Sequence, residues 1–307
     1  MKKILSLLVF CMGLFSYAMA QEDSTKTETK EPEPPKAKYT RATFSATKII
    51  NMQSPEMVSP GALQFMVSHH FSYIWNKDAG SQNLAQFFGL NSGVAHTYLS
   101  FDYSPLTWLN VGVAMAGSSV YEGWAKFKIL RQQTGEKEIP VTIALYSLAN
   151  VNAAKDPEVD ITANKFSFMN QLLIARKFNS KFSLQLNPAW IHFNVVPYGI
   201  NNSNEVFSIG LAGRYKFNSK LGVTMEYSRQ LNMYKNIISK SGAILNYNPD
   251  LLSAGIELST GTHVFQFFVG NTTDASNINQ LAKNTSSIKD GNFAFGFTIN
   301  RSMNLKK

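Results

Sequence analysis

The sequence predicts an all-β protein that folds as an antiparallel transmembrane β-barrel of about 12 strands, with short periplasmic turns and longer extracellular loops. Three observations predict it. Apolar residues recur at every second position from about residue 62 onward, short connections alternate with mostly long ones, and the mature chain has no apolar run of about 18 residues. Because hydrocarbon offers no partner to unpaired backbone groups, such a chain can span a membrane only as a closed barrel.

The N-terminal 38 residues are expected to lie outside the barrel. Residues 1–20 have the layout of a secretory signal peptide: two lysines, a short apolar stretch and a small-x-small end. The apolar stretch is shorter than a membrane span, which favours a signal peptide over an anchor helix. Residues 21–38 are rich in Glu, Lys, Thr and Pro and contain no aromatic residue, which predicts a disordered leader. The barrel domain is therefore expected to cover 39–307.

The composition limits the class of partner. The one cysteine, Cys11, lies in the predicted signal peptide, so the mature chain is expected to have no disulfide and no thiolate metal ligand. The chain has 29 basic and 20 acidic residues, and a basic surplus remains after Lys2 and Lys3 are removed. In an exported protein this surplus predicts contact with outer-membrane lipid, lipopolysaccharide or a small anionic solute, and not with nucleic acid. We therefore expect the protein in the cell outer membrane.

Period-two alternation identifies the strands. In residues 207–217 and 293–300, large apolar side chains share one face, and small or polar side chains share the other. Residues 62–73 alternate in the same way. This pattern suits a barrel wall with its apolar face toward lipid. A β-sandwich also alternates, but its turn signals usually come about every 8 to 12 residues.

Connection lengths favour the barrel over the sandwich. Candidate short turns fall at 104–107, 134–138, 179–181, 218–220 and 259–262. The remaining connections, mostly longer and polar, fall at 75–94, 116–119, 149–164, 197–204, 231–250 and 271–290. Their alternation predicts twelve strands, with both chain ends on the side of the short turns, as in bacterial outer-membrane barrels.

The pentapeptide KFNSK occurs twice, at 177–181 and 216–220, and marks the same rim each time. A three-residue loop at 218–220 would place Tyr215 opposite Val223 and Leu211 opposite Tyr227, which keeps apolar side chains on one face. Aromatic residues beside such turns are expected at the level of the lipid headgroups, with the lysines reaching water or phosphate. The predicted interface aromatics are Phe178, Phe182, Tyr215 and Phe217.

One strand departs from strict alternation. After Pro188 the apolar phase changes, because Ala189, Ile191 and Phe193 follow Phe182, Leu184 and Leu186. Proline cannot donate to a ladder and is tolerated at bulges, so we expect a β-bulge at residues 187–188. The bulge would turn the side chains of Trp190, His192 and Asn194 into the lumen.

Six sequence blocks carry a family resemblance. They are KIINMQSPE, FFGLNSGVAHTYLSFDYSPL, YEGWAKFKILRQ, IARKFNSKFSLQLNPAWIHFN, STGTHVFQFFVGNTTD and DGNFAFGFTINR. Their order resembles an uncharacterised domain-of-unknown-function family of Gram-negative outer-membrane-type β-barrel proteins, over about residues 40–303. The resemblance implies an exported barrel and implies no catalytic residue. One departure is that RSMNLKK follows the last strand, where many outer-membrane barrels end on an aromatic residue.

Charged side chains on the inward face are the candidate functional residues. The predicted lumenal basic residues are Lys126, Lys128, Arg214 and Lys216, and their acidic partners are Glu122 and Glu226. Glu226 lies diagonal to Arg214 in the predicted register, which allows an ion pair between strands. Because lumenal charge tunes solute selectivity, we hypothesise a narrow channel or binding barrel for small anionic solutes. The alternative within the lumen is a charge network that plugs the barrel.

A second hypothesis is a non-conducting surface interaction barrel, whose outer loops bind a partner or lipopolysaccharide. The loops concerned are 75–94, 231–250 and 271–290. Their candidate contact residues are Trp75, Phe87, Phe88, Tyr234, Lys235, Lys240 and Tyr247. The sequence does not decide the oligomeric state.

A membrane-embedded hydrolase is a remote third hypothesis. The chain contains none of the common hydrolase, phosphate-loop or metal-binding motifs, and only His192 or His263 could join a serine near a rim. His69 and His70 are adjacent and point to opposite faces, so they cannot chelate one metal ion together. The acidic loop at 155–160 could bind calcium, although a solvated loop is the simpler interpretation. We expect no enzyme activity, no cofactor and no metal.

Overall fold

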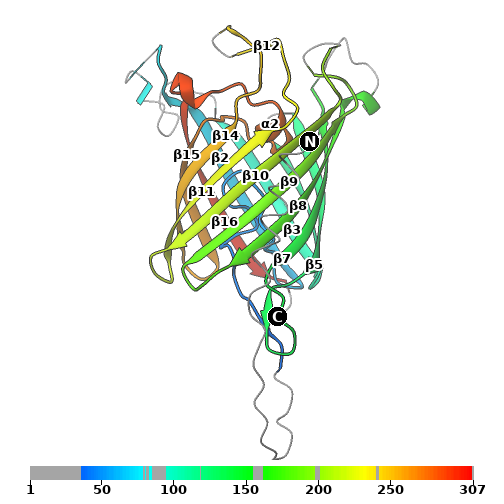
Figure 1. Ribbon diagram of the computed structural model, residues 1–307, viewed down its shortest axis with the longest axis vertical. Coiled ribbons are helices and arrows are strands. Elements are labelled where there is room, and N and C mark those ends of the chain that lie inside the picture. The colour runs from blue at the N-terminus through cyan, green and yellow to red at the C-terminus, as the bar shows by residue number, and fades with distance from the viewer. Residues whose placement is uncertain are drawn as a thin grey trace, which may run out of the picture. The chain divides into compact units, whose positions relative to one another are not determined.

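The computed structural model describes residues 36–305, apart from 79, 81–82, 85–94, 118, 155–161, 198–200 and 240–241. In this part of the chain, twelve strands form one closed barrel (Figure 1). They are β2 (Ala62–Trp75), β3 (His96–Leu106), β4 (Leu109–Ala116), β5 (Val120–Leu130), β7 (Thr142–Asn152), β8 (Phe166–Lys177), β9 (Phe182–Phe193), β10 (Glu205–Lys216), β11 (Leu221–Gln230), β14 (Leu251–Ser259), β15 (His263–Gly270) and β16 (Phe293–Asn304). The predicted signal peptide lies outside the described residues.

Shorter elements complete the structure. They are β1 (Lys38–Tyr39), β6 (Gln133–Thr134), β12 (Ile237–Ile238), β13 (Ile244–Leu245), the helix α2 (Asn277–Ala282) and the 3-10 turns η2 (Thr162–Lys165) and η3 (Ile288–Asp290). β1 pairs with β6, so Lys38, the last residue of the predicted leader, belongs to a small ribbon. The rest of that leader up to residue 35 lies outside the described residues. No helix in the described ranges is long and apolar enough to cross a membrane.

Every strand of the barrel is antiparallel to both neighbours, and the last strand β16 closes the sheet by pairing with the first strand β2. Closure leaves no sheet edge, so the backbone groups of all twelve strands find partners inside the wall, as hydrocarbon requires. The predicted strand number and antiparallel order are confirmed. An irregular register occurs only between β16 and β2, β3 and β4, and β5 and β7.

Short and long connections gather at opposite ends of the barrel (Figure 1). The turns after β3, β8, β10 and β14 and the β5–β7 connection define the turn rim, where the C-terminal strand also ends. The other connections define the loop rim, and most of them are longer. The exceptions are residues 117–119 after β4, a short connection on the loop rim, and residues 131–141 between β5 and β7, a long connection on the turn rim. Figure 1 shows α2 and the β12–β13 hairpin at this rim. The predicted alternation of connection lengths is therefore confirmed.

The repeated NSK turns are built by asparagine. The Asn218 Oδ1 accepts hydrogen bonds from the backbone N–H groups of Lys220 and Leu221, both at 2.9 Å. Asn179 makes the equivalent bonds in the other copy, at 2.9 and 2.8 Å. Such local bonds to the backbone stabilise turns without glycine. The predicted register follows, with Tyr215 opposite Val223 and Leu211 opposite Tyr227.

The predicted β-bulge at Pro188 is wrong. β9 keeps one register with β10 through Asn187 and Pro188, and its register with β8 is the same before and after them. Trp190 is 37% exposed on the outer face, whereas Ile191 and Phe193 are buried inside. The apolar phase changes because the contents of the lumen change along the strand, from polar near the turn rim to apolar near the loop rim.

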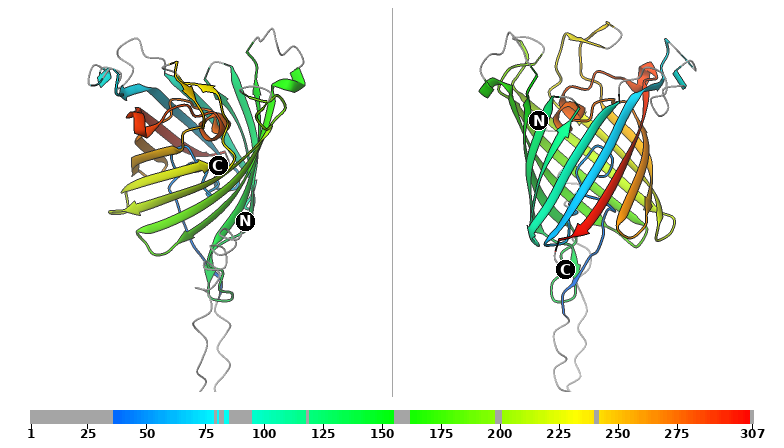
Figure 2. Two further views of the ribbon diagram at one scale, coloured as in Figure 1. Left: turned by 45° about the horizontal axis from the view of Figure 1, so that its top comes forward. Right: turned by 180° about the vertical axis from the view of Figure 1, so that it is seen from behind.

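Two parts of the chain that are not strands occupy the lumen. We call residues 42–58 the lumenal segment and residues 271–291 the lumenal loop. Most residues of both are buried. Figure 2 shows the lumenal segment coiled inside the wall and the lumenal loop, with α2, folded into the mouth at the loop rim. Together they turn a hollow barrel into a filled one.

Candidate functional site

The lumenal segment folds into a narrow turn inside the barrel. Lys48 and Gln53 form an antiparallel bridge, the N–H of Ile49 donates to the Met52 carbonyl at 2.8 Å, and the N–H of Ser54 donates to the Thr47 carbonyl at 2.9 Å. At the tip of this turn, the backbone N–H groups of residues 50–52 have no acceptor within the turn and face the wall. A buried N–H without a partner is costly, so the wall must supply acceptors.

Glu226 of β11 supplies them. Its carboxylate accepts hydrogen bonds from the N–H groups of Ile50, Asn51 and Met52, at 3.3, 2.8 and 3.0 Å. Glu226 is 1% exposed. Successive N–H groups that converge on one point form a concave site for an anion, and here the anion is a side chain of the same protein.

Lys126 of β5 holds the base of the same turn. Its ammonium donates to the carbonyls of Thr47, Ser54 and Glu56, at 3.2, 2.8 and 3.2 Å. An ammonium has three donors, and all three are used. Lys126 is completely buried, so its charge is stabilised by the lumenal segment and not by water.

Arg214 of β10 anchors the start of the segment. Its guanidinium donates to the Ala42 carbonyl at 2.9 Å and to the Ser45 hydroxyl at 2.7 Å, and it lies 3.5 Å from the carboxylate of Glu257. The predicted ion pair between Arg214 and Glu226 is wrong. Glu226 does lie opposite Ala212, as the register predicted, but its carboxylate is taken by the lumenal segment.

Uncharged side chains of the wall complete this interface. Gln185 donates to the Gln53 carbonyl at 2.7 Å, and Gln266 donates to the Ile49 carbonyl at 2.5 Å. Asn51 in turn donates to the Ser253 hydroxyl at 2.8 Å. The polar inner wall is thus complementary to one particular stretch of its own chain.

Glu122 of β5, which lies nearer the loop rim than Lys126 on the same strand, anchors the lumenal loop. Its carboxylate accepts hydrogen bonds from the Ser276 hydroxyl at 2.8 Å and from the Asn277 N–H at 2.9 Å. The same carboxylate accepts from Asn150 at 3.2 Å and from Tyr98 at 3.2 Å. Glu122 therefore fixes the first residues of α2 inside the mouth.

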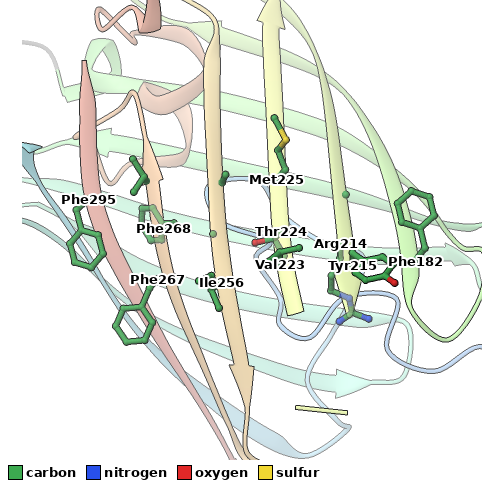
Figure 3. Close-up of a pocket in the computed structure, with 14 residues that line it drawn as sticks. Phe182, Arg214, Tyr215, Val223, Thr224, Met225, Ile256, Phe267, Phe268 and Phe295 are labelled. Carbon is green, nitrogen blue, oxygen red and sulfur yellow. The ribbon is translucent and has the colours of Figure 1, made fainter. Parts of the chain in front are cut away.

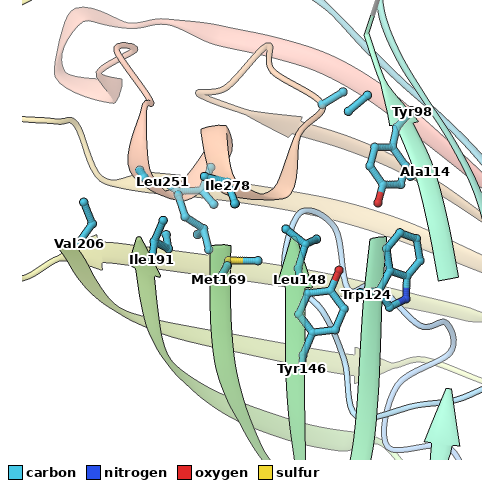
Figure 4. Close-up of a cluster of buried hydrophobic side chains, with 14 of the residues drawn as sticks. Tyr98, Ala114, Trp124, Tyr146, Leu148, Met169, Ile191, Val206, Leu251 and Ile278 are labelled. Atoms are coloured by element: carbon cyan, nitrogen blue, oxygen red, sulfur yellow. The ribbon is translucent and has the colours of Figure 1, made fainter. Parts of the chain in front are cut away.

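Apolar contacts hold the rest of α2. Ile278 and Leu281 belong to a buried cluster that the inner face of the wall provides near the loop rim. Figure 4 shows Ile278 beside Leu251, Met169 and Ile191. This cluster explains why the inward-facing positions of β9 near the loop rim, such as Ile191 and Phe193, are apolar.

The two occupants of the lumen touch each other. Gln53 of the lumenal segment donates to the Asn277 side chain at 3.3 Å. A chain of contacts thus runs from Arg214 at one end of the lumen to Glu122 at the other.

The other predicted lumenal cations lie nearer the turn rim. Lys128 and Lys216 are half-buried, and neither makes a side-chain hydrogen bond among the contacts of the described residues. The proposed role of the four basic residues in contacting a solute remains a prediction.

The four predicted interface aromatics lie together at the turn rim. Phe178 and Phe217 are 52% and 54% exposed. The rings of Phe178 and Phe182 have centroids 5.7 Å apart, and those of Tyr215 and Phe217 are 5.5 Å apart. Exposed paired rings at this height are the arrangement expected at a membrane interface.

Two predictions about outer loops are corrected. The stretch 271–290 is mostly buried in the lumen and does not form a free outer loop. Tyr234 is 1% exposed and its ring lies 6.3 Å from that of Phe193, so it contributes to packing and not to a surface. Trp75 and Tyr247 are exposed as expected. Phe87, Phe88, Lys240 and the acidic loop 155–160 lie outside the described residues.

The two histidines named in the hydrolase hypothesis, His192 and His263, contact a carboxylate and a threonine, and no serine contact of either is seen among the described residues. His192 lies on the outer face with its Nδ1 2.6 Å from the Glu205 carboxylate, and His263 contacts Thr262 at 3.2 Å on the turn rim. Within the described ranges, no group of three or more His, Cys, Asp or Glu could hold a metal ion.

The lumenal segment is the part of the site that was missed from the sequence. Its signal was present, because residues 42–58 are less polar than the leader yet lack the alternation of a strand. A stretch that is neither leader nor strand in a barrel has to be placed inside the wall or at a rim. The wall residue Glu257, which binds Ser45 at 2.7 Å, was missed with it.

A groove of about 740 Å³ lies on the outer face of the strands whose inner face carries Arg214 and Glu226 (Figure 3). Exposed apolar side chains line it, including Tyr215, Met225, Ile256 and Phe267. Small residues at Gly213 and Ala254 form part of its lining. An apolar groove on this face suits a hydrocarbon chain and not a polar solute.

An apolar outer wall, a closed antiparallel sheet and a polar inner wall filled by the protein's own chain together define a membrane-bound β-barrel. The chain belongs to the family described as membrane bound beta barrel domain (DUF5777), which it matches over residues 44–303. The fold class and the family resemblance expected from the sequence are confirmed. No curated protein matches the chain in sequence.

The fold also resembles solved structures of membrane barrels. The match with the KdgM porin covers 78% of this chain and 99% of the porin, at 9% identity and a TM-score of 0.44. The match with an outer membrane channel from Pseudomonas putida F1 covers 81% and 97%, at 13% identity and a TM-score of 0.45. A match with the Pseudomonas putida toluene transporter TodX covers 80% and 90%, at 8% identity and a TM-score of 0.38. These similarities concern the fold alone.

Proposed function

We propose that the protein is an outer-membrane barrel that is closed at rest by its own chain and acts at its loop rim as a binding surface. In this proposal the turn rim faces the periplasm and the loop rim faces outward, as in bacterial barrels with this loop asymmetry. The exposure of Trp75 and Tyr247 at the loop rim favours the binding surface, and one observation carries the closed state. The buried lumenal charges of Lys126, Arg214, Glu226 and Glu122 are engaged by the lumenal segment and the lumenal loop.

The strength of these contacts supports a closed resting state. Glu226 and Lys126 each make three hydrogen bonds to the lumenal segment, and Arg214 makes two. Hydrogen bonds to charged groups contribute about 1.5–3 kcal/mol each. Displacing the segment would break all of these bonds together and would leave the buried charges of the wall without their partners, which is strongly unfavourable. Spontaneous opening is therefore expected to be rare.

Single-protein conductance in a planar lipid bilayer tests this proposal. The full-length barrel should show no stable current at either polarity. A variant without residues 43–58 and with residues 272–290 replaced by a short Gly/Ser linker, confirmed as folded by its heat-modifiable gel migration, serves as the positive control and should conduct. A sustained open current in the full-length barrel would reject a closed resting state.

A second candidate is a narrow channel for small anionic solutes, which would open when the lumenal segment is displaced. The observation that favours it is the position of Lys126, Lys128, Arg214 and Lys216, which the segment's departure would expose to the pore. The same departure would uncover Glu226 and Glu257. The reversal potential of the truncated variant in a salt gradient decides the matter, because anion selectivity supports this candidate and cation selectivity excludes it.

A further inference from the structure

The apolar groove on the outer wall ends beside a group of lysines at the turn rim. Two rows of paired residues line it: Tyr215, Val223, Ile256 and Phe267 form one row, and Gly213, Met225, Ala254 and Val269 form the other. Both rows run across β10, β11, β14 and β15. Phe182 and Tyr215 form the end of the groove nearest the turn rim (Figure 3).

Small residues in the second row help to form the depression. Gly213 has no side chain and Ala254 has only a methyl group, whereas Met225 and Val269 rise between and beyond them. Large side chains in the first row flank the depression. The resulting volume of about 740 Å³ is lined almost entirely by carbon. Contact with hydrocarbon is the favourable way to fill such a surface in a membrane.

The charge at the end of the groove indicates what the hydrocarbon is attached to. Lys181 directly precedes Phe182, and Lys216 directly follows Tyr215. The backbone N–H of Lys216 donates to the Lys181 carbonyl at 2.8 Å, which places Lys181 beside the end of β10, whereas the side chain of Lys216 lies on the lumenal face of that strand. Lys220 is exposed in the next turn. No Asp or Glu lies among the described residues of the two NSK turns, 178–181 and 217–220.

We propose that this groove binds a phospholipid, with an acyl chain along the apolar rows and an anionic headgroup phosphate beside Lys181 and Lys220. Ammonium groups bind phosphate oxygens through charge-assisted hydrogen bonds. The exposed rings of Phe178 and Phe217 place these lysines at headgroup level. The proposal deepens the proposed function by naming a lipid partner. The proposal rests on the proposed orientation in one respect, the choice of leaflet. With the turn rim at the periplasm, the groove would meet the phospholipid of the periplasmic leaflet and not lipopolysaccharide.

Native mass spectrometry of the detergent-purified full chain tests the groove. The barrel is mixed with phosphatidylglycerol, and loosely bound lipid is then removed stepwise with detergent. The measured quantity is the fraction of barrel that still carries one bound lipid as an adduct. Ala254→Phe should fill the groove and abolish this adduct. Gly123→Phe is the matched control, because Gly123 has no neighbour within 4 Å of an added Cβ and lies on another strand, β5. It should retain the adduct.

A second comparison tests the headgroup. The double change Lys181→Gln and Lys220→Gln should weaken phosphatidylglycerol binding about tenfold or more, as expected for lost charged hydrogen bonds. Lys289→Gln, an exposed lysine of η3 at the loop rim, should leave binding unchanged. Equal retention of phosphatidylcholine by the wild-type barrel, retention by Ala254→Phe, or stronger retention of lipopolysaccharide than of phosphatidylglycerol would each overturn the proposal. Conductance is measured separately, so failure here leaves the closed-barrel proposal standing.

Discussion

The carboxylate of Glu226 is the most informative group to change, because it is the charged wall group that accepts three backbone N–H bonds from the tip of the lumenal segment. In Glu226→Gln the side chain keeps its shape but loses its charge, and one of its two acceptor oxygens becomes an amino donor. That donor would face the N–H groups of Ile50, Asn51 and Met52, which the carboxylate now accepts at 3.3, 2.8 and 3.0 Å. We expect the tip to lose its fixed position.

The magnitude follows from these three bonds. A charged hydrogen bond contributes about 1.5–3 kcal/mol, but the neutral amide still accepts one bond and is cheaper to bury than the carboxylate. A net loss of about 3 kcal/mol is expected for the local structure. Since 1.36 kcal/mol corresponds to a tenfold change in an equilibrium, protection of the tip amides should fall about a hundredfold.

Hydrogen exchange read by mass spectrometry on the solubilised barrel measures this change. Peptides that contain residues 49–53 should exchange about a hundredfold faster in the variant, while peptides from β4 and β15 keep their protection. Glu205→Gln is the control, because Glu205 lies on the outer face and contacts His192. Unchanged exchange at the tip in a folded Glu226→Gln barrel would refute the reasoning that this carboxylate holds the segment.

Two further changes test other contacts. Lys126→Met keeps the unbranched shape and most of the length of the side chain but removes all three bonds to the Thr47, Ser54 and Glu56 carbonyls, so brief openings should appear in bilayer recordings. A trace as silent as the wild type would contradict this. Asn218→Ala removes two bonds to the turn backbone, and by analogy with lost helix caps it should destabilise the barrel by about 1 kcal/mol in urea unfolding. Ser219→Ala, in the same turn, should change little, and equal effects of both substitutions would count against the asparagine turn.

Much of the wall could be predicted from the sequence, because its determinants are local. Alternation along a strand decides which side chains face lipid, and the NSK turns set the register of their hairpins through bonds within four residues. The strand number, the two kinds of rim and the pairing of Tyr215 with Val223 all follow from such short-range patterns. The lipid adds the same requirement at every outward position, namely an apolar side chain.

The contents of the lumen could only be decided by the tertiary structure. Glu226 meets residues 50–52, which lie more than 170 positions earlier in the chain, and Glu122 meets Asn277 from a similar distance. Nothing local distinguishes a carboxylate that will pair with Arg214 from one that will bind backbone N–H groups. The phase change after Pro188 was misinterpreted for the same reason. Ile191 shares a buried apolar cluster with Ile278 of α2, and only the closed barrel brings this strand and this helix together.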